Sequence, residues 1–173
     1  MNTIPRPEAN EYFEYYHKYV QMVPEGNLLE QLQKIHGATR NLILSLTEEK
    51  LNYRYESGKW SIKEIMIHLA DAERVFAYRA LRFARKDPTD LAGFDENTYV
   101  PASKAAGRNI TDIMREFETV REATIELLKS FDEEMLMRKG TANKREITVR
   151  ALAYVLAGHE LHHVNIIKER YLK

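Results

Sequence analysis

The sequence has no cysteine and no net charge, and each absence excludes a class of protein. Without cysteine there is no disulfide, no thiolate zinc site and no cysteine nucleophile, so any thiol chemistry needs a thiol supplied by another molecule. Lys plus Arg total 26, and so do Asp plus Glu. This balance argues against nucleic-acid binding or membrane-surface binding as the main role.

Long hydrophobic runs are also missing. No stretch approaches the roughly 20 apolar residues that cross a bilayer, and the first residues lack the apolar core of a signal peptide. We therefore expect a cytoplasmic protein that does not enter a membrane.

The chain has the length and composition of a single soluble domain. Its 173 residues are enough for one hydrophobic core but few for two, and 44% are hydrophobic. We expect one domain over residues 1–173. Within it, residues 1–26 are expected to form an N-terminal extension with a short aromatic helix, packed on the domain or on a second copy, and without a part in the chemistry.

Apolar residues recur every three or four positions in four segments, which are 28–45, 61–83, 109–130 and 148–171. Asn27 is placed to cap the first helix, and Ser61 with Glu64 forms a capping box at the second. No strand signal appears in the segments between them, which are 47–59, 87–109 and 131–146. The pattern predicts an all-α four-helix bundle.

Three histidines lie on apolar stripes of these helices. His159 and His163 are four residues apart, so their Cβ atoms are about 6 Å apart and point the same way. His68 occupies a core-facing position in segment 61–83. Buried imidazoles need partners, and a metal ion accepts their lone pairs. Three neutral nitrogens leave positions on the metal open for water or substrate, which is typical of catalytic metals.

Two carboxylates are candidates for a catalytic role beside these ligands. Asp71 stands three residues after His68 and shares its side of the helix, so we expect it to orient the ring or a bound water. Glu160 is a weaker acid–base candidate, because the residue after His159 is rotated about 100° around the helix.

The 87–109 connector is the longest of the three, and long ordered loops often cover a site. Asp95, Asn97 and Tyr99 are its candidate site residues. A simple crossover between parallel helices explains its length equally well.

The sequence also matches parts of two other metal-site patterns. Residues 159–163 match H-E-x-x-H, the zinc-protease motif in which Glu160 is the general base. Such proteases take a third ligand downstream, and only ten residues follow His163. A ferritin-like di-iron centre needs a second Glu-x-x-His pair, but Ile65 stands three residues before His68. Two further histidines are less favoured as ligands: His36 is an outside candidate at the edge of its stripe, and His162 lies on a flank.

The sequence GKWSIKEIMIHLAD at 58–71, together with HELHH at 159–163, resembles the DinB/YfiT-like superfamily of metal-dependent hydrolases. The resemblance covers about residues 28–171. It implies an up-down-down-up path for the bundle, with the 87–109 connector as one crossover.

The resemblance also implies a divalent metal ion, commonly zinc or nickel, held by His68, His159 and His163. Many members carry Gly-Gln after the paired histidines, whereas this sequence has Asn165-Ile166. The polar lining on that side of the pocket is therefore expected to differ from that of those members.

Some relatives transfer small bacterial thiols such as bacillithiol or mycothiol, and others isomerise maleylpyruvate. We expect a metal-dependent hydrolase or thiol S-transferase that acts on a small molecule, and the aromatic N-terminus and the resemblance favour a homodimer. The alternative is a non-catalytic metal-binding stress or interaction protein. A sealed pocket would favour that alternative, and an open cleft would favour an enzyme. Because protons compete for imidazole, metal affinity should fall as the pH drops through about 6.5.

Overall fold

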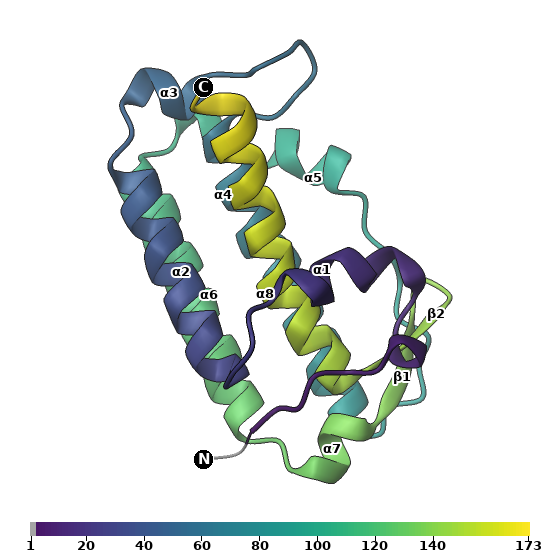
Figure 1. The fold of residues 1–173 in the computed structure, drawn as a ribbon. Coiled ribbons are helices and arrows are strands. Elements are labelled where there is room, and N and C mark those ends of the chain that lie inside the picture. Colours follow the sequence, from purple (N-terminus) through teal and green to yellow (C-terminus); the bar gives the residue numbers. More distant parts are fainter. Residues whose placement is uncertain (1–2) are drawn as a thin grey trace.

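A computed structural model describes residues 3–173, and its four long helices confirm the predicted all-α bundle (Figure 1). These helices are α2 (Leu28–Leu44), α4 (Ile62–Ala84), α6 (Ile110–Lys129) and α8 (Val149–Ile166). The shorter elements are α1 (His17–Met22), α3 (Glu48–Asn52), α5 (Glu96–Ala102), α7 (Glu133–Met137), β1 (Lys139–Ala142) and β2 (Arg145–Thr148). Single 3-10 turns occupy Ala9–Glu11, Glu14–Tyr16 and Ala105–Gly107, and a π-helical turn, Ile167–Tyr171, extends α8.

Local hydrogen bonds begin the helices where the sequence predicts. The Asn27 side chain accepts from the backbone N–H of Leu29 at 2.9 Å. At α4, Ser61 Oγ accepts from the Glu64 N–H, and the Glu64 carboxylate accepts from the Ser61 N–H at 2.7 Å. Each such cap stabilises its helix by about 1 kcal/mol.

Helix α4 is the centre of the bundle, because it packs against both α6 and α8. Its first half meets α6 through Met66 and Phe117, both of them fully buried. Its second half meets α8 and the N-terminal segment through Phe76 and Phe83. The buried apolar residues therefore form two hydrophobic clusters, one around each half of α4.

The N-terminal segment packs on its own domain, along α8. Tyr19 of α1 is buried, and Gly158 of α8 makes this close approach possible. A Cβ at position 158 would lie 2.0 Å from the Tyr19 carbonyl oxygen, which no side chain could tolerate. Glu11 anchors the beginning of the segment: its carboxylate accepts a hydrogen bond from Thr148 Oγ1 at 2.8 Å and forms an ion pair with Arg150.

The prediction that residues 131–146 form a plain connector is wrong, because they contain most of a β-hairpin. Strands β1 and β2 pair antiparallel, and their two-residue turn places Asn143 and Lys144 at φ of 51° and 61°. Four-residue strands are too short to show a convincing alternation, and an Asn-Lys turn lacks the glycine that usually marks such hairpins.

The 87–109 connector is ordered, and it contains α5. Figure 1 shows it returning along the bundle, so that α6 begins at the same end as α4. Leu91 joins it to the hairpin: its N–H donates to the Thr141 carbonyl at 2.9 Å, and its carbonyl accepts from Asn143 at 2.8 Å. Connector and hairpin thereby form one wall beside α4.

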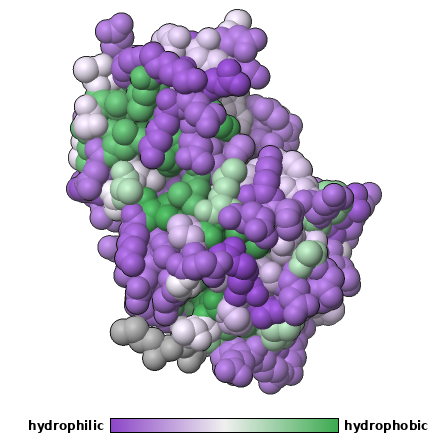
Figure 2. All heavy atoms as spheres, in the orientation of Figure 1, coloured by the Kyte–Doolittle hydropathy of each residue, from purple (hydrophilic) through white to green (hydrophobic). Residues whose placement is uncertain are grey.

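The face seen in Figure 2 is mainly hydrophilic, with hydrophobic atoms gathered over α2 and α8. An apolar groove of about 400 Å³ lies between these two helices, lined by residues that include Ile35, Leu42, Leu161 and Val164. Within residues 3–173, none of the helices combines the length and the apolar character that crossing a bilayer requires.

Candidate metal centre

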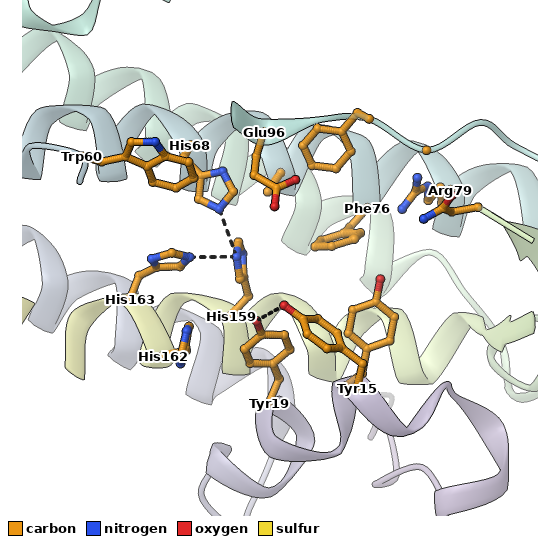
Figure 3. A pocket seen from close by; sticks show the side chains of 15 residues that line it. Tyr15, Tyr19, Trp60, His68, Phe76, Arg79, Glu96, His159, His162 and His163 are labelled. Carbon is orange, nitrogen blue, oxygen red and sulfur yellow. Dashed lines mark hydrogen bonds between the residues drawn. The ribbon is translucent and has the colours of Figure 1, made fainter. Parts of the chain in front are cut away.

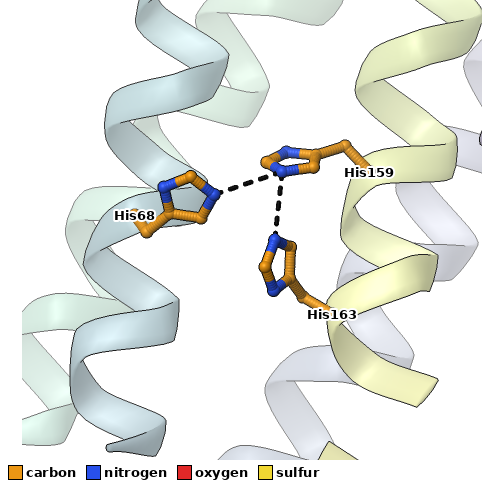
Figure 4. A group of neighbouring side chains, drawn as sticks. All are labelled: His68, His159 and His163. Carbon is orange, nitrogen blue, oxygen red and sulfur yellow. Dashed lines mark hydrogen bonds between the residues drawn. The ribbon is translucent and has the colours of Figure 1, made fainter. Parts of the chain in front are cut away.

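The three predicted ligands converge across the contact between α4 and α8 (Figure 4). Nε2 of His159 lies 3.2 Å from Nε2 of His68 and 3.1 Å from Nε2 of His163. All three ligand atoms lie within 4.8 Å of one another. The spacing of four residues on α8 and the direct packing of α4 on α8 produce this arrangement.

The cluster fits a metal ion better than it fits hydrogen bonds alone. A neutral imidazole nitrogen carries one proton or one lone pair, so Nε2 of His159 cannot form a full hydrogen bond with both neighbours. Two nitrogens held about 2.1 Å from one ion at a tetrahedral or right angle stand about 3.0 to 3.4 Å apart. The observed separations of 3.1 and 3.2 Å fall in that range.

The environment also keeps the three rings in the neutral form that binds metals. Burial lowers the pKa of His68 to about 4 and that of His163 to about 3. It lowers the pKa of His159 well below the ordinary 6.5, and the neighbouring His163 and His68 lower it further. At pH values somewhat below 6.5, the three imidazoles therefore remain neutral and keep a lone pair available for a metal ion.

Aromatic rings hold the histidines in place. Trp60 contacts His68, with ring centroids 4.8 Å apart, and stacks near His163 at 6.4 Å. Tyr19 meets His159 edge-on at 5.6 Å. Nδ1 of His163 is buried without a hydrogen-bond partner among the described residues, so ring packing orients this side chain.

A cavity of about 250 Å³ opens beside the cluster (Figure 3). Its wall is rich in aromatic rings and carries the polar side chains Arg79, Glu96 and Asn143. The described residues that line it are Tyr15, Tyr16, Tyr19, Trp60, His68, Ala72, Phe76, Arg79, Gly93, Phe94, Glu96, Asn143, His159, His162 and His163.

The N-terminal extension, expected to take no part in the chemistry, nevertheless lines the cavity, because α1 and the turn before it place three tyrosines in this wall. Tyr19 lies nearest to the histidine cluster, since its ring contacts that of His159 and also that of His162, with centroids 5.3 Å apart. The tyrosine cluster was visible in the sequence, but nothing local ties it to histidines 140 residues later.

The structure does not place Asp71 in the cavity wall. Its carboxylate accepts a hydrogen bond from Arg74 Nη1 at 3.2 Å. Burial raises the pKa of Asp71, and the charge of Arg74 opposes the shift. Its role in orienting His68 stays a prediction that no contact within the described chain supports.

Glu160 faces the bundle core on the other side of α8. Its carboxylate lies 2.9 Å from Arg121 Nη2 and 3.8 Å from His36 Nδ1. Arg121 also holds Glu73 through two hydrogen bonds of 2.8 and 2.6 Å. Glu160 is therefore part of a buried ionic network, and the protease arrangement, with this glutamate as the base beside the metal, is not formed.

His36 and His162 also lie outside the cluster. His36 is buried against the Phe117 ring at 4.7 Å, and burial lowers its pKa to about 4. His162 lines the cavity against Tyr19 without joining the three ligands.

Among the connector candidates, Asp95 caps α5 by accepting from the Asn97 N–H at 2.9 Å. Tyr99 is 47% exposed, and Asn97 lines a smaller cavity of about 200 Å³ shared with His163. The residue between the first two candidates, Glu96, is the one that faces the histidine cavity. The sequence pointed to this stretch of connector but not to this side chain.

Comparison with known proteins identifies the family of this chain. A model of the DinB superfamily matches residues 31–167. A protein of Oceanobacillus iheyensis named "Putative metal-dependent hydrolase" is 27% identical over 143 residues, which is 81% of each chain. A protein of the same description from Geobacillus thermodenitrificans is 23% identical over 134 residues, 76% of this chain and 75% of its own.

Two solved structures share the fold. YfiT from Bacillus subtilis, described as "a probable metal-dependent hydrolase with an unusual four-helix bundle topology", superimposes with a TM-score of 0.76 at 17% identity over 82% of both chains. The DinB-like protein YjoA of Bacillus subtilis gives 0.60 at 19% identity, over 83% of this chain and 88% of its own. The family match spans most of the sequence and includes all three histidines of the cluster, and the chain belongs to the DinB superfamily.

Proposed function

We propose that this protein is a metal-dependent enzyme for a small-molecule substrate, with one divalent ion held by His68, His159 and His163. The observation that carries the proposal is the convergence of three neutral Nε2 atoms in the wall of a cavity of about 250 Å³. An accessible space beside the ligands is what an enzyme needs and what a purely structural metal site lacks. Zinc and nickel are the candidate ions, since both accept imidazole nitrogen.

An ion in this position supplies Lewis acidity, which lowers the pKa of water or of a thiol toward neutrality. The chain's own residues then have separate tasks. Trp60 and Phe76 pack against His68 and His159, and we assign these rings the task of limiting the access of bulk water to the histidines, which would strengthen electrostatic interactions there. Glu96 points its carboxylate into the cavity (Figure 3), and we assign it the transfer of the nucleophile's proton.

Hydrolysis is the first reaction class, supported by the names of the relatives from Oceanobacillus and Geobacillus. Thiol transfer is the second, and the wall of the cavity favours it. A thiol has a pKa near 8.5 and needs little help from a base, sulfur packs well against aromatic rings, and Glu96 is the single carboxylate among the described residues lining the cavity. The chain itself has no cysteine, so the thiol is a substrate.

The metal site is tested first, by elemental analysis of protein purified without an affinity tag. We expect one zinc or nickel ion per chain. His163→Ala should lose the stoichiometric metal while keeping the helical circular dichroism, and His162→Ala, the matched control, should keep the metal. Full occupancy in His163→Ala would refute the ligand assignment.

The reaction class is then tested with the metal-loaded protein. Bacillithiol, mycothiol and glutathione are offered with monochlorobimane, and a panel of esters and amides is offered without a thiol. Metal-dependent conjugation that is lost in His159→Ala supports thiol transfer, and turnover of the panel supports hydrolysis. Absence of both would favour the non-catalytic metal-binding alternative. The homodimer remains a proposal, and light scattering of the same sample tests it.

A further inference from the structure

Arg79 lies at the far end of the same cavity, on the same face of α4 as His68. The two residues are eleven positions apart, which is three helical turns and about 16 Å along the axis. Ala72 and Phe76 lie between them on this face and also line the cavity. In Figure 3 the arginine stands beyond Phe76, away from the three histidines.

The guanidinium of Arg79 is buried, with the residue only 5% exposed. Its Nη2 donates to the Ala92 carbonyl at 2.8 Å, and its Cζ lies 5.7 Å from the Phe76 ring centroid. Neither contact neutralises the charge. None of the ion pairs found within residues 3–173 involves Arg79.

The other buried arginine of the bundle shows what a compensated charge looks like in this protein. Arg121 is 2% exposed and binds the carboxylates of Glu73 and Glu160. A buried cation is strongly unfavourable without such a partner. Arg79 is somewhat less deeply buried than Arg121 and lacks its carboxylates, yet it faces a space that a ligand can enter.

We propose that Arg79 binds a carboxylate of the substrate. Nη2 is already engaged by Ala92, and the rest of the planar guanidinium is left for a carboxylate, whose geometry it matches. A phosphate dianion fits less well, because Arg79 is the only arginine or lysine among the described residues of the wall and Glu96 adds a negative charge.

The substrate class that follows is a small molecule with a carboxylate at one end and its reactive group at the other. The carboxylate site depends only on Arg79 and the aromatic wall. The placement of the reactive group at the histidines rests on the proposed function.

The test compares carboxylates with their uncharged primary amides. Butyrate, hexanoate, 3-phenylpropionate and 4-phenylbutyrate are each paired with the amide of equal shape, and phenylphosphonate tests a dianion. Binding is measured by calorimetry on the metal-loaded wild type and on Arg79→Met, Arg79→Lys and Arg82→Gln. Arg82 is the matched control, since it lies one turn further along α4 and pairs with Asp87 outside the cavity.

In the wild type, at least one carboxylate should bind about 10- to 100-fold more tightly than its amide, as for a hydrogen-bonded charge. The preference should vanish in Arg79→Met, persist in part in Arg79→Lys and remain in Arg82→Gln. Equal binding of every acid and amide would overturn the proposal, as would a preference that survives in Arg79→Met or tighter binding of phenylphosphonate.

His163→Ala separates this result from the proposed function. A carboxylate preference that is unchanged in His163→Ala shows binding at Arg79 without help from a metal. If His163→Ala keeps its metal, the ligand assignment fails while the Arg79 proposal stands on its own ratio. If the metal assignment holds but no carboxylate preference appears, only the Arg79 proposal fails.

Discussion

Removal of the Arg121 guanidinium should be one of the most destabilising single changes in this protein. Arg121 crosses the bundle from α6 and binds Glu73 on α4 and Glu160 on α8. Its Nη1 also donates to the Leu32 carbonyl of α2 at 3.0 Å. One side chain therefore joins all four long helices, and Arg121→Met keeps most of its apolar stem while deleting the charge.

The magnitude follows from the two carboxylates left behind. The side chains of Glu73 and Glu160 are 3% and 1% exposed, so water cannot replace the lost cation. Removing one partner of a buried ion pair costs about 3–5 kcal/mol. In a chain of this size, 1 kcal/mol corresponds to about 2–4 °C in Tm, so Arg121→Met should lower Tm by roughly 6–20 °C.

The stability that Arg121→Met loses relative to the wild type should depend on pH, and the direction can be predicted. Burial already raises the pKa of Glu160, and Arg121→Met removes the largest influence that opposes this shift, leaving the hydrogen bond with Thr39. The folded variant then binds more protons than the unfolded chain above the ordinary carboxyl pKa, so its stability decreases as the pH rises. The difference from wild type should therefore shrink between pH 7 and pH 5.

Urea unfolding, followed by circular dichroism at pH 7 and pH 5, measures both quantities. Arg115→Met is the control, because Arg115 is an exposed arginine of the same helix that pairs only with Asp112; it should change stability by less than about 0.5 kcal/mol. A loss in Arg121→Met no larger than in Arg115→Met, or a loss that is the same at both pH values, would refute the reasoning.

Three further predictions concern the site. Gly158→Ala should lower the stability by about 1–3 kcal/mol and expose the N-terminal segment to proteolysis, because the new Cβ would meet the Tyr19 carbonyl at 2.0 Å. The control Gly37→Ala, in open space within α2, should instead raise the stability by about 0.5–1 kcal/mol, and equal effects of the two variants would contradict the close packing of α1 on α8. Metal affinity, measured by competition with a chelator, should stay nearly constant from pH 7.5 to about pH 5 and fall near pH 4, since burial lowers the pKa of His68 to about 4 and that of His163 to about 3; a midpoint near 6.5 would restore the expectation from sequence. Glu96→Gln should keep the metal and lower kcat by about 10²- to 10⁴-fold, whereas Asp71→Asn should stay near wild type, and the opposite order would favour the orienting role predicted for Asp71 over the role proposed for Glu96.

Local sequence predicted the bundle and the histidines that cluster in it. The caps at Asn27 and Ser61 and the apolar stripes act over three or four residues, so helical geometry alone predicts where each helix begins and which side it buries. The same geometry paired His159 with His163. His68 was added to this predicted pair because the apolar stripe on which it lies must face the same core.

Tertiary packing decided the rest of the site. Tyr19 reaches His159 because Gly158 lets two backbones approach, and Glu96 reaches the cavity because the connector is tied to the hairpin. These contacts join residues far apart in the chain, and no local period encodes them.

Two buried charged residues show the same limit of prediction from sequence. Glu160 and Arg79 are both charged residues on otherwise apolar helices, and their sequence neighbourhoods do not say which is neutralised. The fold brings Arg121 to Glu160 and brings only a carbonyl and an aromatic ring to Arg79. Whether a buried charge has a partner depends on side chains from other helices, so only the three-dimensional structure separates the charge that holds the bundle together from the charge left facing the cavity.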